Sequence, residues 1–262
     1  MVDEVKLKMK SAKRKTEDFE CKVRSFNIKL KIPSKVFKPN TDSLLFAKKI
    51  RIHPGEMVLE MGTGSGLIGI VAAKLGAGEI TAVDINPHAL ACAKANAIVN
   101  RVIDKFRFIK SDLFSNIPRK KFDVVIFNPP FATSFLFAHK HPRKDKWYLA
   151  ARAGGKTGNE IFFRFLDEVK GYCTKKTRIY TIITGAQQKE AAAKKIGKDF
   201  KIKTVGSDTL ITIKETLVRN ANAHRELIQK FKIPISIRAN RFFFSLRLVE
   251  LHIKKCKSDS SD

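Results

Sequence analysis

The stretch VLEMGTGSGLIG, residues 58–69, decides the fold of this chain. It runs from an apolar strand pattern through closely spaced glycines into the first turn of a helix. Glycine is needed there because the backbone turns sharply and approaches a ligand without a Cβ in the way. The helix that begins at Gly66 then presents free N–H groups to an anionic group. Gly64-x-Gly66-x-x-Gly69 also satisfies the dinucleotide-binding pattern, so the loop alone does not identify its ligand.

Outward from this loop, apolar strand patterns alternate with segments of helical length. Strands are predicted at residues 56–61, 79–84, 106–110, 122–127 and 178–184, and helices at 66–76, 87–100, 158–172 and 187–197. Later strands are predicted at 200–206, 208–214 and 241–253, with a helix at 215–231. Strands that alternate with helices of this length form βαβ units. The predicted fold class is therefore α/β, with a Rossmann-like, doubly wound sheet of seven strands and an antiparallel edge.

The sequence predicts one α/β domain with two polar ends. The chain has 262 residues, 44% of them hydrophobic, which is enough apolar material for one large core. Residues 1–35 are expected to form a basic N-terminal arm, mobile over 1–20, with a strand pattern at 22–32. The main domain is expected over 36–253, with an early helix that starts at the capping side chains of 40–43, and 254–262 as a polar tail.

The chain is strongly basic. It has 52 Lys and Arg against 25 Asp and Glu, which gives a net charge of +27. Such a surplus attracts polyanions, so RNA or DNA is the expected partner. A basic surface that only keeps the protein soluble is the alternative.

Membrane segments and disulfides are not expected. No stretch approaches 18 apolar residues, and the charged N-terminus lacks the apolar region of a secretory signal. The four cysteines lie far apart and form no CxxC pair, which argues against structural zinc and fits a reducing cytoplasm.

Three acidic residues that follow or end predicted strands narrow the choice of ligand. Asp84 ends the strand after the loop, 18 residues beyond Gly66, where a carboxylate can accept hydrogen bonds from both hydroxyls of a ribose. Glu60 would repel a pyrophosphate but not a cationic sulfonium, which favours S-adenosylmethionine. Asp112 follows the third strand, where it could accept from an adenine amino group. The alternatives are a helix-dipole partner for Glu60 and a turn cap for Asp112.

The fourth predicted strand ends in Asn128-Pro129-Pro130-Phe131. Two prolines cannot continue a sheet, so the chain leaves into a stiff turn at the edge where open α/β sheets bind ligands. The Asn128 amide oxygen and the Pro129 carbonyl can both accept protons from one planar amino group, which aims its lone pair at a methyl group. Phe131 offers a ring face for stacking on an unstacked base. A proline-rich turn that only ends the strand is the alternative.

The segment 132–157 places His139, His141, Trp147, Tyr148 and Arg152 among lysines. Basic and aromatic residues mixed in this way beside the proline turn suit an RNA strand with a splayed base. An ordinary solvated loop with one anchoring aromatic residue is the alternative. The two histidines have no evident third ligand, so no metal site is expected.

Together these features resemble the class I S-adenosylmethionine-dependent N-methyltransferases, over about residues 36–185. The resemblance extends to their HemK-like branch, which includes release-factor glutamine methyltransferases. Residues 36–42 (VFKPNTD) resemble that branch's segment before the glycine loop, and 154–158 (GGKTG) resemble its later glycine segment. The resemblance implies S-adenosyl-L-methionine as cofactor, Asp84 on its ribose, Asp112 on its adenine side, and residues 128–131 at the target nitrogen.

The candidate site follows from the motifs and the resemblance together. The candidate catalytic residues are Asn128, Pro129, Pro130 and Phe131. The candidate cofactor-binding residues are Glu60, Gly62, Thr63, Gly64, Gly66, Asp84, Ile85, Asp112, Leu113 and Asn128.

The sequence departs from the glutamine enzymes in two respects. They usually have tyrosine where this chain has Phe131, and the bacterial ones carry an N-terminal helical domain for which the residues before Val36 are too few and too charged. Enzymes that methylate adenine N6 or guanine N2 of nucleic acids share the Asn-Pro-Pro-Phe form. We therefore predict a cytoplasmic enzyme that methylates an exocyclic amino nitrogen of RNA, either rRNA or tRNA.

Three alternatives stay open at this point. The first is a protein glutamine methyltransferase acting on a release factor, as the HemK-like segments suggest. The second is a non-catalytic RNA-binding factor that kept the cofactor fold. The third is an NAD-dependent oxidoreductase, because the glycine pattern is shared.

Overall fold

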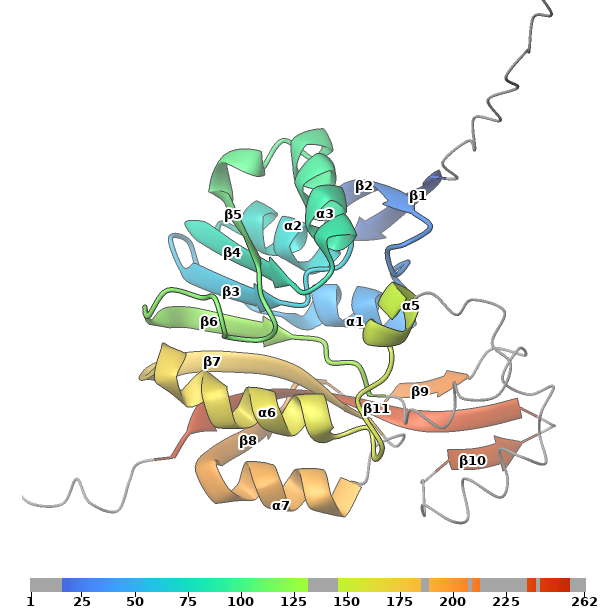
Figure 1. Ribbon diagram of the computed structural model, residues 1–262, viewed down its shortest axis with the longest axis vertical. Coiled ribbons are helices and arrows are strands. Elements are labelled where there is room, and N and C mark those ends of the chain that lie inside the picture. Colours follow the sequence, from blue (N-terminus) through green and yellow to red (C-terminus); the bar gives the residue numbers. More distant parts are fainter. Residues whose placement is uncertain are drawn as a thin grey trace, which may run out of the picture.

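A computed structural model describes residues 16–131, 146–184, 189–206, 209–212, 235–238 and 241–254 of the chain. Within these residues the central sheet has nine strands, seven of them in the order β10-β11-β7-β6-β3-β4-β5 (Figure 1). Five neighbours are parallel: β7 (Cys173–Thr184), β6 (Phe122–Phe127), β3 (Met57–Met61), β4 (Glu79–Asp84) and β5 (Phe106–Lys110). The antiparallel strand β11 (Arg241–Ile253) pairs with β7 and with β8 (Phe200–Thr204), β9 (Thr209–Thr212) and β10 (Ile235–Arg238).

Helices cover both faces of this sheet (Figure 1). One face carries α1 (Thr41–Lys49), α2 (Leu67–Lys74) and α3 (Pro87–Val99), and the other carries α6 (Glu160–Glu168) and α7 (Lys189–Asp199). The short elements are α5 (Lys146–Ala150) and the 3-10 turns η1 (Ile103–Lys105) and η2 (Val169–Tyr172). Strand side chains alternate between two cores: Val58 and Val124 belong to the first, and Leu59 and Val125 to the second. The doubly wound sheet with an antiparallel edge is confirmed.

Several predicted boundaries agree with the structure. β4, β5 and β6 have the predicted bounds, and α1 begins at Thr41 with Asn40 as its N-cap. β7 begins at Cys173 instead of residue 178, because the polar residues after Cys173 hide the strand pattern there. The helix predicted at 215–231 and residues 255–262 of the tail lie outside the described part of the chain.

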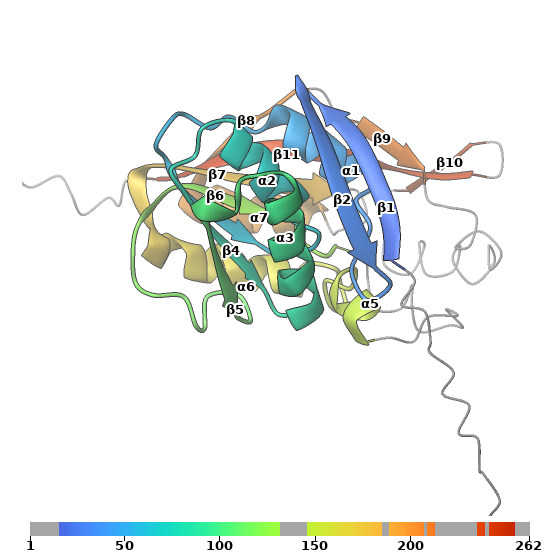
Figure 2. The same cartoon turned by 90° about the horizontal axis from the view of Figure 1, so that it is seen from above.

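The ordered structure begins nearer the N-terminus than the sequence predicted, because residues 16–20 belong to a strand and not to a mobile arm. β1 (Thr16–Val23) and β2 (Phe26–Pro33) form an antiparallel hairpin that runs beside α3 (Figure 2), and apolar side chains of β2 join the first core. The turn between the strands holds Arg24 at a φ of 55°. Its guanidinium donates to the Lys48 carbonyl at 3.1 Å and to the Ile50 carbonyl at 2.5 Å. Neither Gly nor Asn occupies this turn, so the sequence contains no hairpin signal there. For this reason one strand was predicted at 22–32, where the structure has two.

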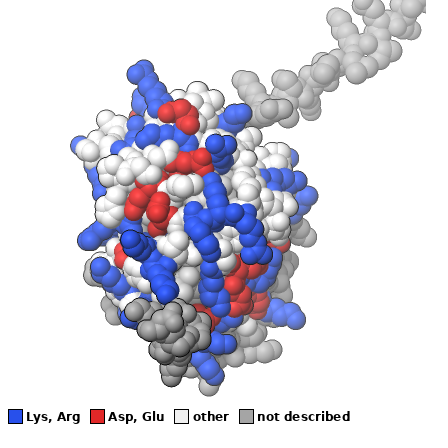
Figure 3. All heavy atoms as spheres, turned by 90° about the vertical axis from the view of Figure 1, so that its left-hand side faces the viewer, with Lys and Arg blue, Asp and Glu red and all other residues white. Residues whose placement is uncertain are grey.

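Charges of both signs cover the face at the amino ends of the parallel strands. Figure 3 shows Lys and Arg there interspersed with Asp and Glu. Glu79 accepts from Arg107 and from Lys120 at 2.5 Å each, and Glu56 pairs with Arg178 at 2.5 Å. Several of the basic side chains on the described part of this face are therefore paired with acidic ones.

Neither a membrane span nor a metal cluster is found in the described ranges. No helix there combines the length and the apolar character needed to cross a bilayer. No three His, Cys, Asp or Glu side chains of the same ranges are grouped to hold a metal ion. His139 and His141 lie outside them.

Candidate functional site

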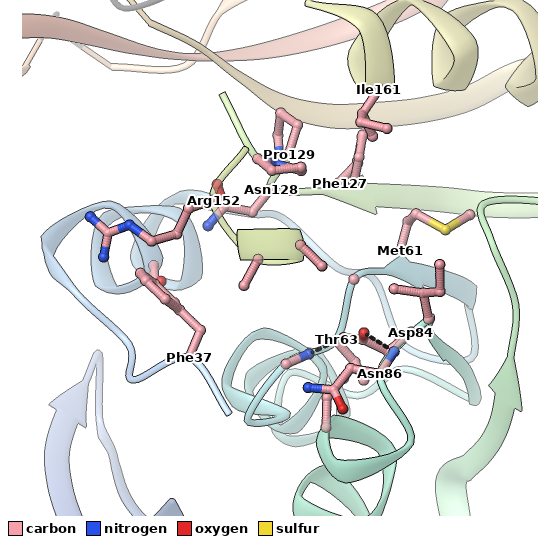
Figure 4. A pocket seen from close by; sticks show the side chains of 18 of the residues that line it. Phe37, Met61, Thr63, Asp84, Asn86, Phe127, Asn128, Pro129, Arg152 and Ile161 are labelled. Carbon is pink, nitrogen blue, oxygen red and sulfur yellow. Dashed lines mark hydrogen bonds between the residues drawn. The ribbon is translucent and has the colours of Figure 1, made fainter. Parts of the chain in front are cut away.

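A large pocket lies at the carboxyl ends of β3, β4 and β6. Figure 4 shows Asp84 and Asn86 on one side of it, and Asn128 and Pro129 on the opposite side. This is the edge of the sheet where an open α/β fold binds its ligands. The predicted residues that line the pocket are Gly62, Thr63, Gly64, Asp84, Ile85, Asp112, Leu113, Asn128, Pro129, Pro130 and Phe131. Glu60 and Gly66 were also predicted to bind the cofactor, but they are not among the lining residues.

The glycine loop adopts a backbone that only glycine holds without strain. Gly62, Gly64 and Gly66 have φ values of 69°, 56° and 83°. Added Cβ atoms at Gly62 and Gly64 would meet nothing closer than 3.9 Å, so these two are needed for their conformation. At Gly66 a Cβ would lie 3.1 Å from Ala93 Cα, so this glycine also lets the loop approach α3. Gly66 thus shapes the loop from behind and does not form the pocket wall.

Glu60 is buried beneath the loop and is not among the residues that line the pocket. Side chains alternate along β3, so Glu60 shares the α2 side of the sheet with Val58. Its carboxylate accepts from Thr63 Oγ1 at 2.7 Å and from the Gly69 N–H at 3.0 Å. Burial raises the pKa of Glu60 to about 7, against the opposing effect of these two hydrogen bonds. Through these bonds Glu60 braces the glycine loop and the start of α2, and its contact with the cofactor stays a prediction.

Asp84 presents a fixed carboxylate to the pocket. Its Oδ2 accepts from the Gly64 N–H and its Oδ1 from the Asn86 N–H, both at 2.9 Å. Burial raises the pKa of this carboxyl, and the backbone hydrogen bonds counteract that rise. Ile85 follows on the pocket wall and is 45% exposed, which leaves an apolar surface for a flat ligand.

Asp112 and Leu113 lie on the pocket wall after β5. Asp112 accepts from Arg164 of α6 at 3.2 Å, an ion pair that the sequence analysis did not foresee. Leu113 has a positive φ of 46° and a buried side chain. Met61 and Phe127 add apolar surface from β3 and β6 (Figure 4). They could have been found in the sequence as the last residues of their strands.

Asn128 brings an unused acceptor to the pocket. Its Oδ1 is buried, and no hydrogen bond reaches this atom from the described residues. A buried acceptor left unpaired costs about 1–3 kcal/mol, so this oxygen is suited to receive an N–H group of a ligand. Pro129, Pro130 and Phe131 continue the turn along the pocket wall.

The glycine segment 154–158 supports this turn from behind. A Cβ on Gly154 would lie 2.5 Å from the Pro130 carbonyl oxygen and 2.5 Å from that of Gly158. Glu160 holds the segment, because its carboxylate accepts from the Thr157 N–H at 2.9 Å and from the Asn159 N–H at 3.2 Å. The absence of a side chain at Gly154 therefore allows two backbone segments to meet at the proline turn.

The pocket also includes residues that the sequence motifs did not assign to the cofactor or catalytic site. Phe37, Asn40 and Asp42 form one wall, and Arg152 places its guanidinium 5.4 Å from the Phe37 ring centre (Figure 4). Burial raises the pKa of Asp42, while a hydrogen bond with Asn40 and the charge of Arg152 lower it. Residues 36–42 had been noted for their resemblance to a family segment and residues 40–43 as helix-capping side chains, and these were the available signals.

Trp147 of α5 also lines the pocket. The Trp147 ring meets the His88 ring edge-on, with 6.2 Å between the two ring centres. Lys146 Nζ lies 4.7 Å from the centre of the Trp147 ring. Of the segment 132–157, the structure describes residues from 146 onward. Two of these, Trp147 and Arg152, line the pocket.

Comparison with known proteins places the chain among enzymes. It matches the methyltransferase small domain over residues 35–140. A Methanocaldococcus jannaschii protein, provisionally named protein N5-glutamine methyltransferase, is 38% identical over 197 residues, which cover 74% of this chain and 95% of the relative. A release factor glutamine methyltransferase from Koribacter versatilis is 37% identical over 139 residues, which cover 50% of this chain and 48% of the relative. The chain thus spans nearly all of the first relative and about half of the second.

A solved structure shows the same fold at low sequence identity. The T. thermophilus 16S rRNA N2 G1207 methyltransferase, in complex with AdoMet and guanosine, superposes with a TM-score of 0.56 at 14% identity. The superposition covers 92% of this chain and 51% of that one.

Proposed function

The chain belongs to the methyltransferase small-domain family of class I S-adenosylmethionine-dependent N-methyltransferases, and we propose that its acceptor is the side-chain amide nitrogen of a protein glutamine. The observation that carries this proposal is the buried, unpaired Asn128 Oδ1 on the wall of the pocket. An amide NH₂ group is a small planar donor that satisfies such an acceptor.

The pocket residues fit S-adenosylmethionine. Gly62 and Gly64 leave the wall free of side chains, and Asp84 holds a carboxylate that can accept from two ribose hydroxyls. Asp112 would face the adenine, beside the apolar surface of Ile85 and Leu113. When bound, this cofactor supplies a methyl group made electrophilic by the sulfonium charge.

The proline turn would activate the acceptor nitrogen. The lone pair of an amide nitrogen is delocalised into its carbonyl, so the group is a poor nucleophile. Asn128 Oδ1 would accept one N–H and the Pro129 carbonyl the other, which returns electron density to the nitrogen and fixes the direction of its lone pair. The new N–CH₃ bond would form as the S–CH₃ bond breaks, with the electron pair left on sulfur. No strong base is needed, because the nitrogen then carries four bonds and readily releases one proton to water.

Relatives support glutamine over a nucleobase as the acceptor. The relative that aligns over 95% of its own length is named as a protein N5-glutamine methyltransferase, and the second is named for release factors. Translation proteins of this kind would place the activity in the cytoplasm.

Methylation of RNA is the second candidate. It is favoured by the net charge of +27 and by Phe131, whose aromatic ring could stack on a splayed adenine or guanine. A non-catalytic RNA-binding role would rest on the same charge.

The acceptor can be identified with S-adenosylmethionine labelled in its methyl group. The protein is incubated with separated RNA and protein fractions from its own cell, followed by protease or nuclease treatment of the labelled material. We expect the label in a protein, and N5-methylglutamine after proteolytic digestion.

Two variants show whether the transfer depends on the assigned pocket. Asn128→Ala should slow labelling by about 10²–10³-fold while cofactor binding persists, and Asp84→Ala should weaken cofactor binding itself. Label that nuclease releases would establish the RNA acceptor instead. Tight, salt-sensitive RNA binding without label in either fraction would establish the non-catalytic role.

A further inference from the structure

Asn96 of α3 and Asn100, the C-cap of this helix, hold the N-terminal hairpin by its backbone. Asn96 Oδ1 accepts from the Lys31 N–H at 2.8 Å, and Asn100 Oδ1 accepts from the Lys29 N–H at 3.3 Å. In return, Asn100 Nδ2 donates to the Lys29 carbonyl at 2.7 Å, and Asn96 Nδ2 lies 3.4 Å from the Lys31 carbonyl. The two amides are one helical turn apart and bond alternate residues of β2 in the way a neighbouring strand would.

Asn96 alone of these two also reaches the glycine loop. Its Nδ2 donates to the Ser65 carbonyl at 2.9 Å, and its side chain is fully buried. The N–H of the same peptide group belongs to Gly66 and donates to the Thr63 carbonyl at 2.8 Å. Both polar groups of the peptide between Ser65 and Gly66 are therefore hydrogen-bonded. Asn96 holds its carbonyl, and the Thr63 carbonyl holds its N–H.

The hairpin in turn leads into the wall of the pocket. After β2, the Lys35 carbonyl accepts from Asn86 Nδ2 at 3.0 Å, and Asn86 itself lines the pocket. Phe37 and Pro39 follow, and both also line the pocket. The glycine loop, α3 and the segment after the hairpin thus surround one site. Asn96 contacts the glycine loop and also β2, the strand that leads into that segment.

We propose that Asn96 is a positioning residue for the cofactor site, which couples docking of the N-terminal hairpin to the conformation of the glycine loop. A bound cofactor would then stabilise the hairpin through Asn96, and a docked hairpin would strengthen cofactor binding by the same factor. This inference rests on the proposed placement of S-adenosylmethionine and is independent of the acceptor.

Calorimetric titration with S-adenosylmethionine and hydrogen exchange of the hairpin amides test the proposal on the full chain. In the wild-type protein, saturating cofactor should slow exchange of the Lys29 and Lys31 amides. Asn96→Ala should raise the cofactor Kd about 5-fold, the effect of one net hydrogen bond, and should remove this protection.

Asn100→Ala is the matched control, because it releases the hairpin at Lys29 but makes no contact with the loop. Its Kd should stay within about 2-fold of wild type, with protection at Lys31 retained. Equal increases of the cofactor Kd in Asn96→Ala and Asn100→Ala would overturn the proposal. It would also be overturned if saturating cofactor left the exchange rate of the wild-type hairpin amides unchanged, a result that needs no variant. Absence of S-adenosylmethionine binding to the wild type would overturn the cofactor placement as well.

Discussion

The substitution Gly154→Ala should disable methyl transfer through a displacement that can be worked out from the structure. Gly154 is buried and its φ is not positive, so alanine suits its backbone conformation. The added Cβ would nevertheless lie 2.5 Å from the carbonyl oxygens of Pro130 and Gly158. An ordinary contact begins near 3.4 Å, so the two backbones must separate by about 0.9 Å.

A shift of this size at the proline turn should lower kcat about 100-fold, because positioning errors near 1 Å have that effect on oriented reactions. The cofactor Kd should change little, since Gly154 is not bonded to the glycine loop. The assay is single-turnover methyl transfer from labelled S-adenosylmethionine to the identified acceptor, with Kd measured separately by calorimetry.

Gly197→Ala on α7 is the control for the general effect of replacing glycine. Gly197 is exposed, and an added Cβ there would meet nothing within 4 Å. This variant should keep wild-type kcat and gain up to about 1 kcal/mol of stability from better helix propensity. A folded Gly154→Ala protein with kcat within 2-fold of wild type would refute the argument that this glycine sets the position of the turn.

Three further predictions follow from the site. Asn128→Ala should reduce kcat by about 10²–10³-fold with an unchanged cofactor Kd, as judged by the same two assays; a parallel loss of cofactor binding would contradict the assigned role. Asp84→Ala should weaken S-adenosylmethionine binding about 10–100-fold in calorimetry, because charge-assisted hydrogen bonds are lost, and an unaltered Kd would remove Asp84 from the site. Glu60 has a folded pKa of about 7 against 4.5 for the ordinary carboxyl, so folding favours its protonated form; its stabilising contribution is complete below about pH 4.5 and is lost as pH rises through 7. Glu60→Gln should therefore flatten the decline in unfolding free energy between pH 5 and 8 in urea titrations, by up to about 3 kcal/mol, and equal pH dependence of both proteins would argue against a raised pKa.

The parts of the site that could be predicted from the sequence are those where local backbone chemistry determines the geometry. The glycine loop, Asp84 and the turn at Asn128 each follow a strand, and parallel strands bring such ends to one edge of the sheet. Glu60 is close to the loop in sequence, but the alternation of side chains along β3 directs it to the opposite side of the sheet from Met61, and it is not among the pocket-lining residues.

Other features depend on contacts between distant segments and leave little local signal. Gly154 meets Pro130 across a long stretch of sequence, and its role depends on the absence of a side chain. Asn96 lies in the last turn of α3, where asparagine has no strong helix propensity of its own, and its partners lie in β2 and the glycine loop. Such residues are recognised only when the three-dimensional contacts are known.

The position of Trp147 gives the protein a built-in optical probe. The chain has one tryptophan, and that residue lines the pocket beside His88. Its emission therefore reports on this location and on no other part of the molecule. Rapid mixing of unlabelled protein with cofactor can follow the entry and release of the ligand in real time.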